Sequence, residues 1–185
     1  MNPTLRLAVF ALLDKEMNNH GSWCGETHLQ KATFVLQELL GAKTGYDFIL
    51  YKYGPFSFEV RDDISLMRAN GLIDVIVRDP QYGPSYVPTP FAEVFLQRFP
   101  KTVEAHHAQA KFVAENLGSK NVSDLERIAT ALFIRKRSKV KSRERRAEEL
   151  VRLKPHISGP DALQATKDVD VLAERSKALV MHAHG

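Results

Sequence analysis

The chain of 185 residues contains a single cysteine and no long hydrophobic run. One cysteine excludes an internal disulfide framework and a zinc site built from cysteines alone, and it is typical of a reducing cytoplasm. No apolar run approaches the ~20 residues that a membrane-spanning helix needs, so we expect neither such a helix nor a membrane partner. Residues 7–13 are apolar but lead directly into charged residues without a cleavage site, which indicates a retained helix rather than a signal peptide.

Common catalytic and nucleotide-binding motifs are also missing. The sequence has no G-x-S-x-G elbow, no H-E-x-x-H motif and neither of the glycine-rich phosphate loops G-x-x-x-x-G-K-[ST] and G-x-G-x-x-G. The neighbouring carboxylates Asp62 and Asp63 would point about 100° apart on a helix and could not share one substrate. We therefore expect no enzyme activity, no catalytic residue and no cofactor. A site assembled from residues distant in the sequence stays open as an alternative.

One group of residues has the spacing of metal ligands. His20, Cys24 and His28 follow one another at intervals of four, and their nitrogen and sulfur atoms are the ligand types that zinc prefers. Gly21 and Gly25 indicate that this stretch is a loop, where the spacing does not bring the three side chains together. We predict no metal site here and interpret Cys24 as a small buried hydrophobe.

What remains is the composition of an ordinary globular protein, with 44% hydrophobic and 26% charged residues. The length fits one compact domain over residues 1–185, made of a lobe over 1–100 and a helical lobe over 101–185. Periodicity predicts five elements in the first lobe: a helix ending before Gly21, a helix ending at Gly41, a strand over 46–53, a helix from Pro55 to Gly71, and a hairpin of 72–78 and 85–89.

This order of helix, helix, strand, helix and hairpin is typical of a winged-helix-like unit. Pro55 fits the first turn of the third helix. The second lobe is predicted to be all helical, with helices over 90–99 and 102–117, one beginning at a capping box of Ser123 and Glu126, one ending near Pro155 and one from Pro160. The expected fold class is mainly α with a small β component, in which the winged-helix-like half packs on a C-terminal helical bundle.

The positive charge of the chain is concentrated in one segment. The net charge is +4, but residues 135–146 hold eight basic residues against Glu144, and the rest of the chain sums to −3. The eight are Arg135, Lys136, Arg137, Lys139, Lys141, Arg143, Arg145 and Arg146. We call residues 135–146 the basic segment.

Three interpretations of the basic segment stay open. It can be a solvated connection between two helices, it can neutralise the phosphates of a nucleic acid, or it can dock an acidic partner protein. The helix from Pro55 to Gly71, which would enter DNA in a winged-helix protein, carries two arginines against three acids. Because phosphate attraction supplies most non-specific affinity for DNA, we expect any nucleic acid to bind at the basic segment instead.

Several short segments between residues 27 and 156 carry a family resemblance. They are THLQKA at 27–32, YDFILYKYGP at 46–55, FSF at 56–58, RANGLI at 68–73, LERIATALFIRK at 125–136 and LKPH at 153–156. In their order and spacing they resemble the YwgA-like proteins and the related Panacea, or SocA-type, antitoxin domain. The shared features are a Leu-Gln-Lys on a helix and a Tyr-Gly-Pro after a strand.

The resemblance implies a small bacterial helical protein with a winged-helix-like half and no established catalytic residues. Panacea relatives are antitoxins that bind and neutralise toxins of varied chemistry, and a similar domain forms part of antitoxins against DNA-modifying ADP-ribosyltransferases. It therefore implies a partner protein, such as a toxin encoded nearby, in a bacterial cytoplasm. We expect an interaction module that is antitoxin-like or a regulatory accessory protein. The alternative is a nucleic-acid-binding regulator that uses the basic segment, and the oligomeric state stays open.

The residues that carry the resemblance allow two roles. In the structural role, Gly54 and Pro55 shape the turn between the strand and the helix, and Lys31 donates to carbonyls of that turn. In the second role the region is a partner-binding surface, because aromatic residues such as Tyr51 and Tyr53 near Lys52 suit an interface anchor. The candidate partner-binding residues are Lys31, Tyr51, Lys52, Tyr53, Gly54 and Pro55.

Overall fold

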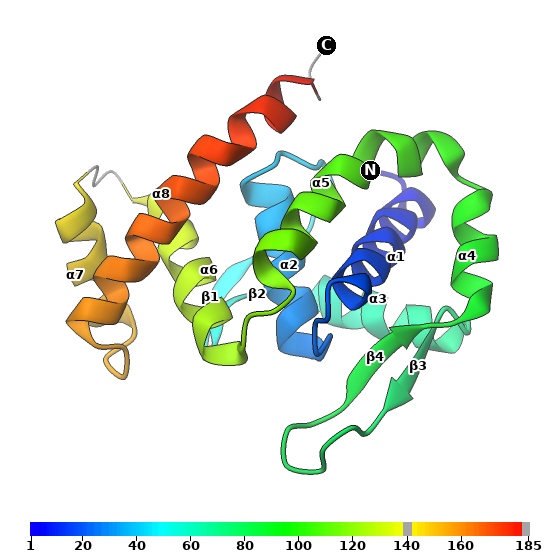
Figure 1. The fold of residues 1–185 in the computed structure, drawn as a ribbon, viewed down its shortest axis with the longest axis horizontal. Coiled ribbons are helices and arrows are strands. Elements are labelled where there is room, and N and C mark those ends of the chain that lie inside the picture. The colour runs from blue at the N-terminus through cyan, green and yellow to red at the C-terminus, as the bar shows by residue number, and fades with distance from the viewer. Residues whose placement is uncertain (139–141, 183–185) are drawn as a thin grey trace.

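The computed structural model describes residues 1–138 and 142–182. This part of the chain holds eight helices and four short strands, and the strands pair in two separate antiparallel sheets (Figure 1). In chain order the elements are α1 (Pro3–Asn19), α2 (Glu26–Glu38), β1 (Ile49–Tyr51), β2 (Gly54–Phe56), α3 (Phe58–Ala69), β3 (Ile73–Ile76), β4 (Ser85–Pro88), α4 (Pro90–Gln97), α5 (Pro100–Leu117), α6 (Val122–Arg137), α7 (Arg143–Leu153) and α8 (Gly159–His182). The prediction of a mainly helical fold with a small β component is confirmed.

Helix α1 is buried on all sides over most of its length. Asn2 caps it by accepting a hydrogen bond from the amide of Thr4 at 2.8 Å, and Pro3 occupies the first turn, where its missing N–H is not needed. Every residue from Leu7 to Asp14 is buried, although the periodicity predicts a single apolar stripe. A helix that is apolar all round belongs in a core, and α2, α3, α4 and α5 all contact α1.

The chain after α2 forms a tight hairpin instead of the single strand predicted over residues 46–53. In this β1–β2 hairpin, Leu50 lies opposite Pro55 and Tyr51 lies opposite Gly54. Pro55 therefore belongs to a strand, and the prediction that it starts the third helix is wrong. The reason is Gly54, whose φ of +85° reverses the chain before a helix can begin.

Helix α3 begins at Phe58 because the residue before it is held in an extended conformation. The buried side chain of Gln30 accepts a hydrogen bond from the amide of Ser57 and donates one to its carbonyl, both at 2.9 Å. The hydroxyl of Ser57 then caps α3 by accepting from the amide of Val60. Since Gln30 belongs to α2, this contact fixes where the hairpin ends relative to that helix.

The second hairpin, β3–β4, lies where the sequence predicts it and extends away from the helices (Figure 1). Ile73 lies opposite Pro88 in its register. The amide of Tyr86 donates to the carbonyl of Cys24 at 2.9 Å. This bond joins β4 to the loop between α1 and α2.

Helix α6 begins one residue before the predicted capping box. Asn121 caps it by accepting a hydrogen bond from the amide of Asp124 at 2.9 Å, and Ser123 lies inside the first turn. The capping-box prediction is wrong because Asn121 is an equally strong N-cap two residues earlier. Glu126 is instead buried, where α6 meets the chain that follows α7.

All eight described helices contribute side chains to one hydrophobic core, which extends from Leu7 in α1 to Leu172 in α8. Helices α5 and α6, from the predicted second lobe, contact α2, and α5 also packs along α1. The core therefore continues across the boundary that the sequence predicts at residue 100. None of the described helices is long and apolar enough to cross a membrane.

Candidate functional site

The β1–β2 hairpin and the start of α2 enclose a pocket of about 260 Å³, which we call the hairpin pocket. Its lining includes five of the six candidate partner-binding residues, together with Glu26, Thr27, Gln30, Phe56 and Arg61. The sixth candidate, Pro55, accepts a hydrogen bond from the Lys31 ammonium through its carbonyl at 3.0 Å. The structure thus brings all six residues together at one place.

Lys31 is the most unusual member of this group because its side chain is buried. Only 2% of the residue is exposed, and its hydrogen bond to the carbonyl of Pro55 is the contact that the structural role requires. Burial lowers the pKa of Lys31 from 10.5 to about 8, although the nearby charge of Glu126 acts in the opposite direction. At neutral pH the ammonium therefore stays mostly protonated inside the protein.

A second buried lysine holds the other side of the hairpin. The Lys154 ammonium, just after α7, donates to the carbonyl of Tyr51 at 2.6 Å and also to the carbonyl of Lys52. It lies 3.4 Å from a carboxylate oxygen of Glu126, and both side chains are only 7% exposed. His156 approaches the same carboxylate oxygen to 3.2 Å. We call Lys31, Glu126 and Lys154 the buried charge cluster.

The sequence reasoning missed Glu126 and Lys154 as parts of this site. Both lie within segments that carry the family resemblance, LERIATALFIRK and LKPH, and that was the available signal. Their pairing is tertiary, because Glu126 comes from α6 and Lys154 follows α7. No local spacing could show that they meet under the β1–β2 hairpin.

Gly54 allows the hairpin to lie close against α6. A Cβ atom at this position would lie 3.0 Å from the hydroxyl oxygen of Thr130 and 3.5 Å from the carbonyl oxygen of Glu126. Its φ of +85° also favours glycine over any residue with a side chain. Both requirements explain the glycine of the Tyr-Gly-Pro turn.

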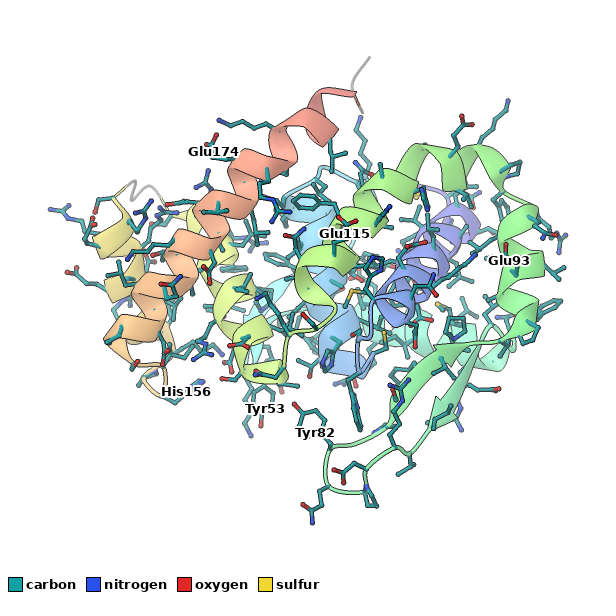
Figure 2. The ribbon with its side chains drawn as sticks, viewed as in Figure 1. Tyr53, Tyr82, Glu93, Glu115, His156 and Glu174 are labelled. Atoms are coloured by element: carbon teal, nitrogen blue, oxygen red, sulfur yellow. The ribbon has the colours of Figure 1, made fainter. Side chains whose placement is uncertain are left out.

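Exposed aromatic side chains lie on the β1–β2 hairpin and at the start of α3. Tyr51, Tyr53 and Phe58 are 55%, 50% and 56% exposed. The buried ring of Phe56 lies between two of them, with centroids 5.5 Å from Tyr51 and 5.2 Å from Phe58. We call Tyr51, Tyr53 and Phe58 the aromatic surface. In Figure 2, Tyr53 and His156 lie at the same edge of the molecule.

The basic segment is partly neutralised within the protein. Arg146 makes two hydrogen bonds to the carboxylate of Asp170 in α8, at 2.9 and 2.8 Å, and Arg143 makes a third at 3.1 Å. Arg135 contacts the same carboxylate. Burial opposes ionisation of Asp170, but its hydrogen bonds to Arg146 and Arg143 outweigh it and lower its pKa.

Other members of the segment differ in their surroundings. Arg137 donates to the carbonyl of Phe48 at 2.9 Å and lies over the ring of Phe133, 4.4 Å from its centroid. Lys136 and Arg145 are exposed, while Lys139 and Lys141 lie outside the described residues. The interpretation as a solvated connection is wrong for Arg146, whose side chain is only 6% exposed. Whether the segment also binds nucleic acid or an acidic protein stays a prediction.

His20, Cys24 and His28 do not share a site, because the two histidines bond to different backbone groups and Cys24 is a free, buried thiol. The His20 ring contacts the carbonyl of Glu16 at 2.8 Å, and the buried His28 ring bonds to the backbone of Lys120. The Cys24 thiol is buried, so its pKa rises to about 12. Within residues 1–138 and 142–182, no three His, Cys, Asp or Glu side chains gather as a metal site requires.

Comparison with known proteins returns no match: the chain matches no family model, no curated protein and no solved structure.

Proposed function

We propose that the protein is a non-enzymatic interaction module that binds one partner protein through the aromatic surface of the β1–β2 hairpin. The observation that carries this proposal is the cluster of exposed rings that forms the aromatic surface. The buried Lys31 and Lys154 donate hydrogen bonds to the backbone of the hairpin beside these rings. By the family resemblance, the module is antitoxin-like or a regulatory accessory protein in a bacterial cytoplasm, and its partner is a protein such as a toxin encoded nearby.

Exposed aromatic residues are a strong source of binding energy at protein interfaces. Tyr51 and Phe58 flank the buried ring of Phe56, so their rings are positioned before any partner arrives. Lys154 and Lys31 donate to backbone carbonyls of the hairpin at Tyr51, Lys52 and Pro55. A surface that is ordered in advance loses little conformational entropy on binding, which favours a specific complex.

We further propose that the N-terminal half is winged-helix-like, as the order α1, α2, the β1–β2 hairpin, α3 and the β3–β4 hairpin supports. Its third helix is unsuited to DNA. Arg61 pairs with Glu26 at 2.9 Å and lies over the ring of Phe56 at 4.7 Å. The half serves as the scaffold of the β1–β2 hairpin in this proposal.

A pull-down from the native host tests the proposal. The tagged wild-type chain is compared with the double variant Tyr51→Ala, Tyr53→Ala, at about 0.1 M salt so that charge interactions are only partly screened. Each sample is divided into nuclease-treated and untreated halves, and the bound proteins are identified by mass spectrometry. The matched control is Phe91→Ala, which removes an equally exposed ring from α4.

We expect one stoichiometric protein that survives nuclease treatment, remains with Phe91→Ala and is lost at least tenfold with the double variant, as for two interface anchors. Retention of the same protein by all three chains would contradict the use of the aromatic surface. Material that disappears on nuclease treatment would contradict the proposal as a whole and favour nucleic-acid binding through the basic segment.

A further inference from the structure

The hairpin pocket contains a buried cation without a paired anion. The Lys31 ammonium makes one hydrogen bond, to the carbonyl of Pro55, and an ammonium has three donors. Within the described residues it forms no ion pair, because Glu126 is paired with Lys154 and His156 instead. Glu126 favours the Lys31 charge from a distance but makes no direct ion pair with it, so a carboxylate brought into contact with the ammonium would be favoured.

The rest of the lining has the same preference for an anion. Lys52 and Arg61 add two cations to Lys31, and Glu26 is the one carboxylate among the lining residues. Arg61 uses its Nε atom for Glu26, at 2.9 Å, which leaves the two terminal nitrogens of its guanidinium for another acceptor. The pocket therefore offers more donors than acceptors.

The size of the pocket limits what it can hold. Its volume of about 260 Å³ lies below the roughly 300–1,000 Å³ of typical small-molecule sites, which favours a single side chain over a larger ligand. One acidic side chain fits, and the rings of Tyr51 and Phe56 provide apolar walls for its methylene groups. The pocket also opens beside the aromatic surface, where the partner is proposed to bind.

We propose that the hairpin pocket receives an aspartate or glutamate side chain of the partner protein, whose carboxylate pairs with the Lys31 ammonium. This inference rests on the proposed function and adds the chemical nature of the partner's anchor. Lys31 then has two roles: it holds the hairpin through Pro55, and it provides the counter-charge for the partner. Arg61 is the second donor, at the mouth of the pocket.

A titration with defined probes tests this inference without the partner. The probes are N-acetyl-glutamate methylamide and its glutamine analogue, which differ only in the side-chain charge. They are added to the purified full chain while backbone amide signals are followed by NMR. We expect saturable shifts within residues 51–56 for the glutamate probe in the millimolar range, as for a small ligand with one strong contact, and none for the glutamine probe.

Three variants locate the contact. Lys31→Met should weaken glutamate binding about tenfold or more, the usual effect of losing a charge-assisted hydrogen bond. Lys111→Met is the matched control, since Lys111 on α5 is exposed, pairs with Glu115 and does not line the hairpin pocket, and it should leave binding unchanged. If Lys31→Met does not fold, Arg61→Gln decides, because Arg61 is exposed and its loss leaves Glu26 unpaired in the pocket.

Equal binding of the two probes, no saturable shift, or unchanged affinity in both Lys31→Met and Arg61→Gln would overturn the inference. These results would leave the proposed function untouched if the pull-down still depends on Tyr51 and Tyr53. If the glutamate probe binds but the pull-down captures no partner, the preference of the pocket for a carboxylate is supported and the proposed interaction module is contradicted. The two failures are therefore distinguishable.

Discussion

Asp14 is a carboxylic acid in the centre of the molecule, with no exposed surface. Burial raises its pKa from 3.8 to about 8, although hydrogen bonds from Asn18 and Cys24 act in the opposite direction. Two buried bases shift the other way: burial lowers the pKa of His28 from 6.5 to about 4 and that of Lys31 from 10.5 to about 8. These three residues each make the free energy of unfolding depend on pH.

Whether stability rises or falls with pH depends on whether the folded or the unfolded state binds more protons. The folded state holds the Asp14 proton more tightly, so stability from this residue is present below pH 3.8 and is lost as the pH rises towards 8. The lowered pKa of His28 gives the reverse dependence between pH 4 and 6.5, where the two effects offset each other. Lys31 adds stability as the pH rises from 8 to 10.5. Between pH 6.5 and 8, Asp14 dominates among the three.

We predict that Asp14→Asn removes a loss of stability between pH 6.5 and 8. In the wild-type chain this loss is at most about 1.4 kcal/mol per pH unit, the value for one proton. Urea unfolding at several pH values measures it, and the variant should exceed the wild type by the largest margin at pH 8. Asp62→Asn, on the exposed face of α3, serves as the control. An unchanged slope in Asp14→Asn would show that another group titrates in this range.

Among the elements, the β1–β2 hairpin shows how a local turn and a tertiary contact depend on each other. Gly54 has a positive φ and lies against Thr130 of α6. Gly45 has a similar φ of +81°, but a Cβ atom added there would meet nothing within 4 Å. Substituting the two glycines in turn therefore separates the cost of backbone strain, which both positions carry, from the cost of a steric clash, which only Gly54 carries.

We predict that Gly54→Ala destabilises the protein more than Gly45→Ala. Backbone strain alone costs about 1–2 kcal/mol per residue, and both variants carry it. In Gly54→Ala the new Cβ also pushes the hairpin away from α6, which should add about 1 kcal/mol or more and weaken partner capture. Thermal unfolding and the pull-down measure both effects. Equal losses in the two variants would mean that the contact with Thr130 is not close enough to matter.

Local patterns were enough to predict most elements, and tertiary contacts explain the exceptions. The α6 stripe of Leu125, Ile128 and Leu132 is buried, as its spacing requires. The start of α3 could not be predicted, because Gln30, distant in the sequence, holds Ser57 extended. Because the end of the hairpin is fixed by Gln30 of α2, the sequence around Ser57 carries no periodic signal for where α3 begins.

The candidate site was likewise predictable only in part. Lys31 and the Tyr-Gly-Pro turn stood out through the resemblance, and the structure places them in contact through the carbonyl of Pro55. The pairing of Glu126 with Lys154 was beyond the sequence, since Glu126 also fitted a local capping box. Sequence reasoning assigned Glu126 to Ser123, its neighbour along the chain, because the pairing with Lys154 forms only in the folded protein.

At the scale of the whole molecule, Asp170 joins three helices at one end of the structure. Arg135 comes from α6, Arg143 and Arg146 come from α7, and all three meet the carboxylate on α8. These helices lie beside one another in Figure 1. The basic segment therefore also connects these helices. Because Asp170 pairs with three of its arginines, the segment presents less positive charge to a partner than the sequence suggests.

We predict that Asp170→Asn costs about 2–4 kcal/mol of unfolding free energy, because it leaves the buried guanidinium of Arg146 without an anion. Asp168→Asn, two residues away on α8, keeps the side-chain oxygen that accepts a hydrogen bond from Gln164 at 2.8 Å, so it should change stability by less than about 0.5 kcal/mol. Adding Arg146→Met to Asp170→Asn should recover part of the loss, since a missing ion pair costs less than a broken one. Urea unfolding of the wild type, Asp170→Asn, Arg146→Met and the double variant measures the cycle, and additive losses would show that Arg146 and Asp170 act independently.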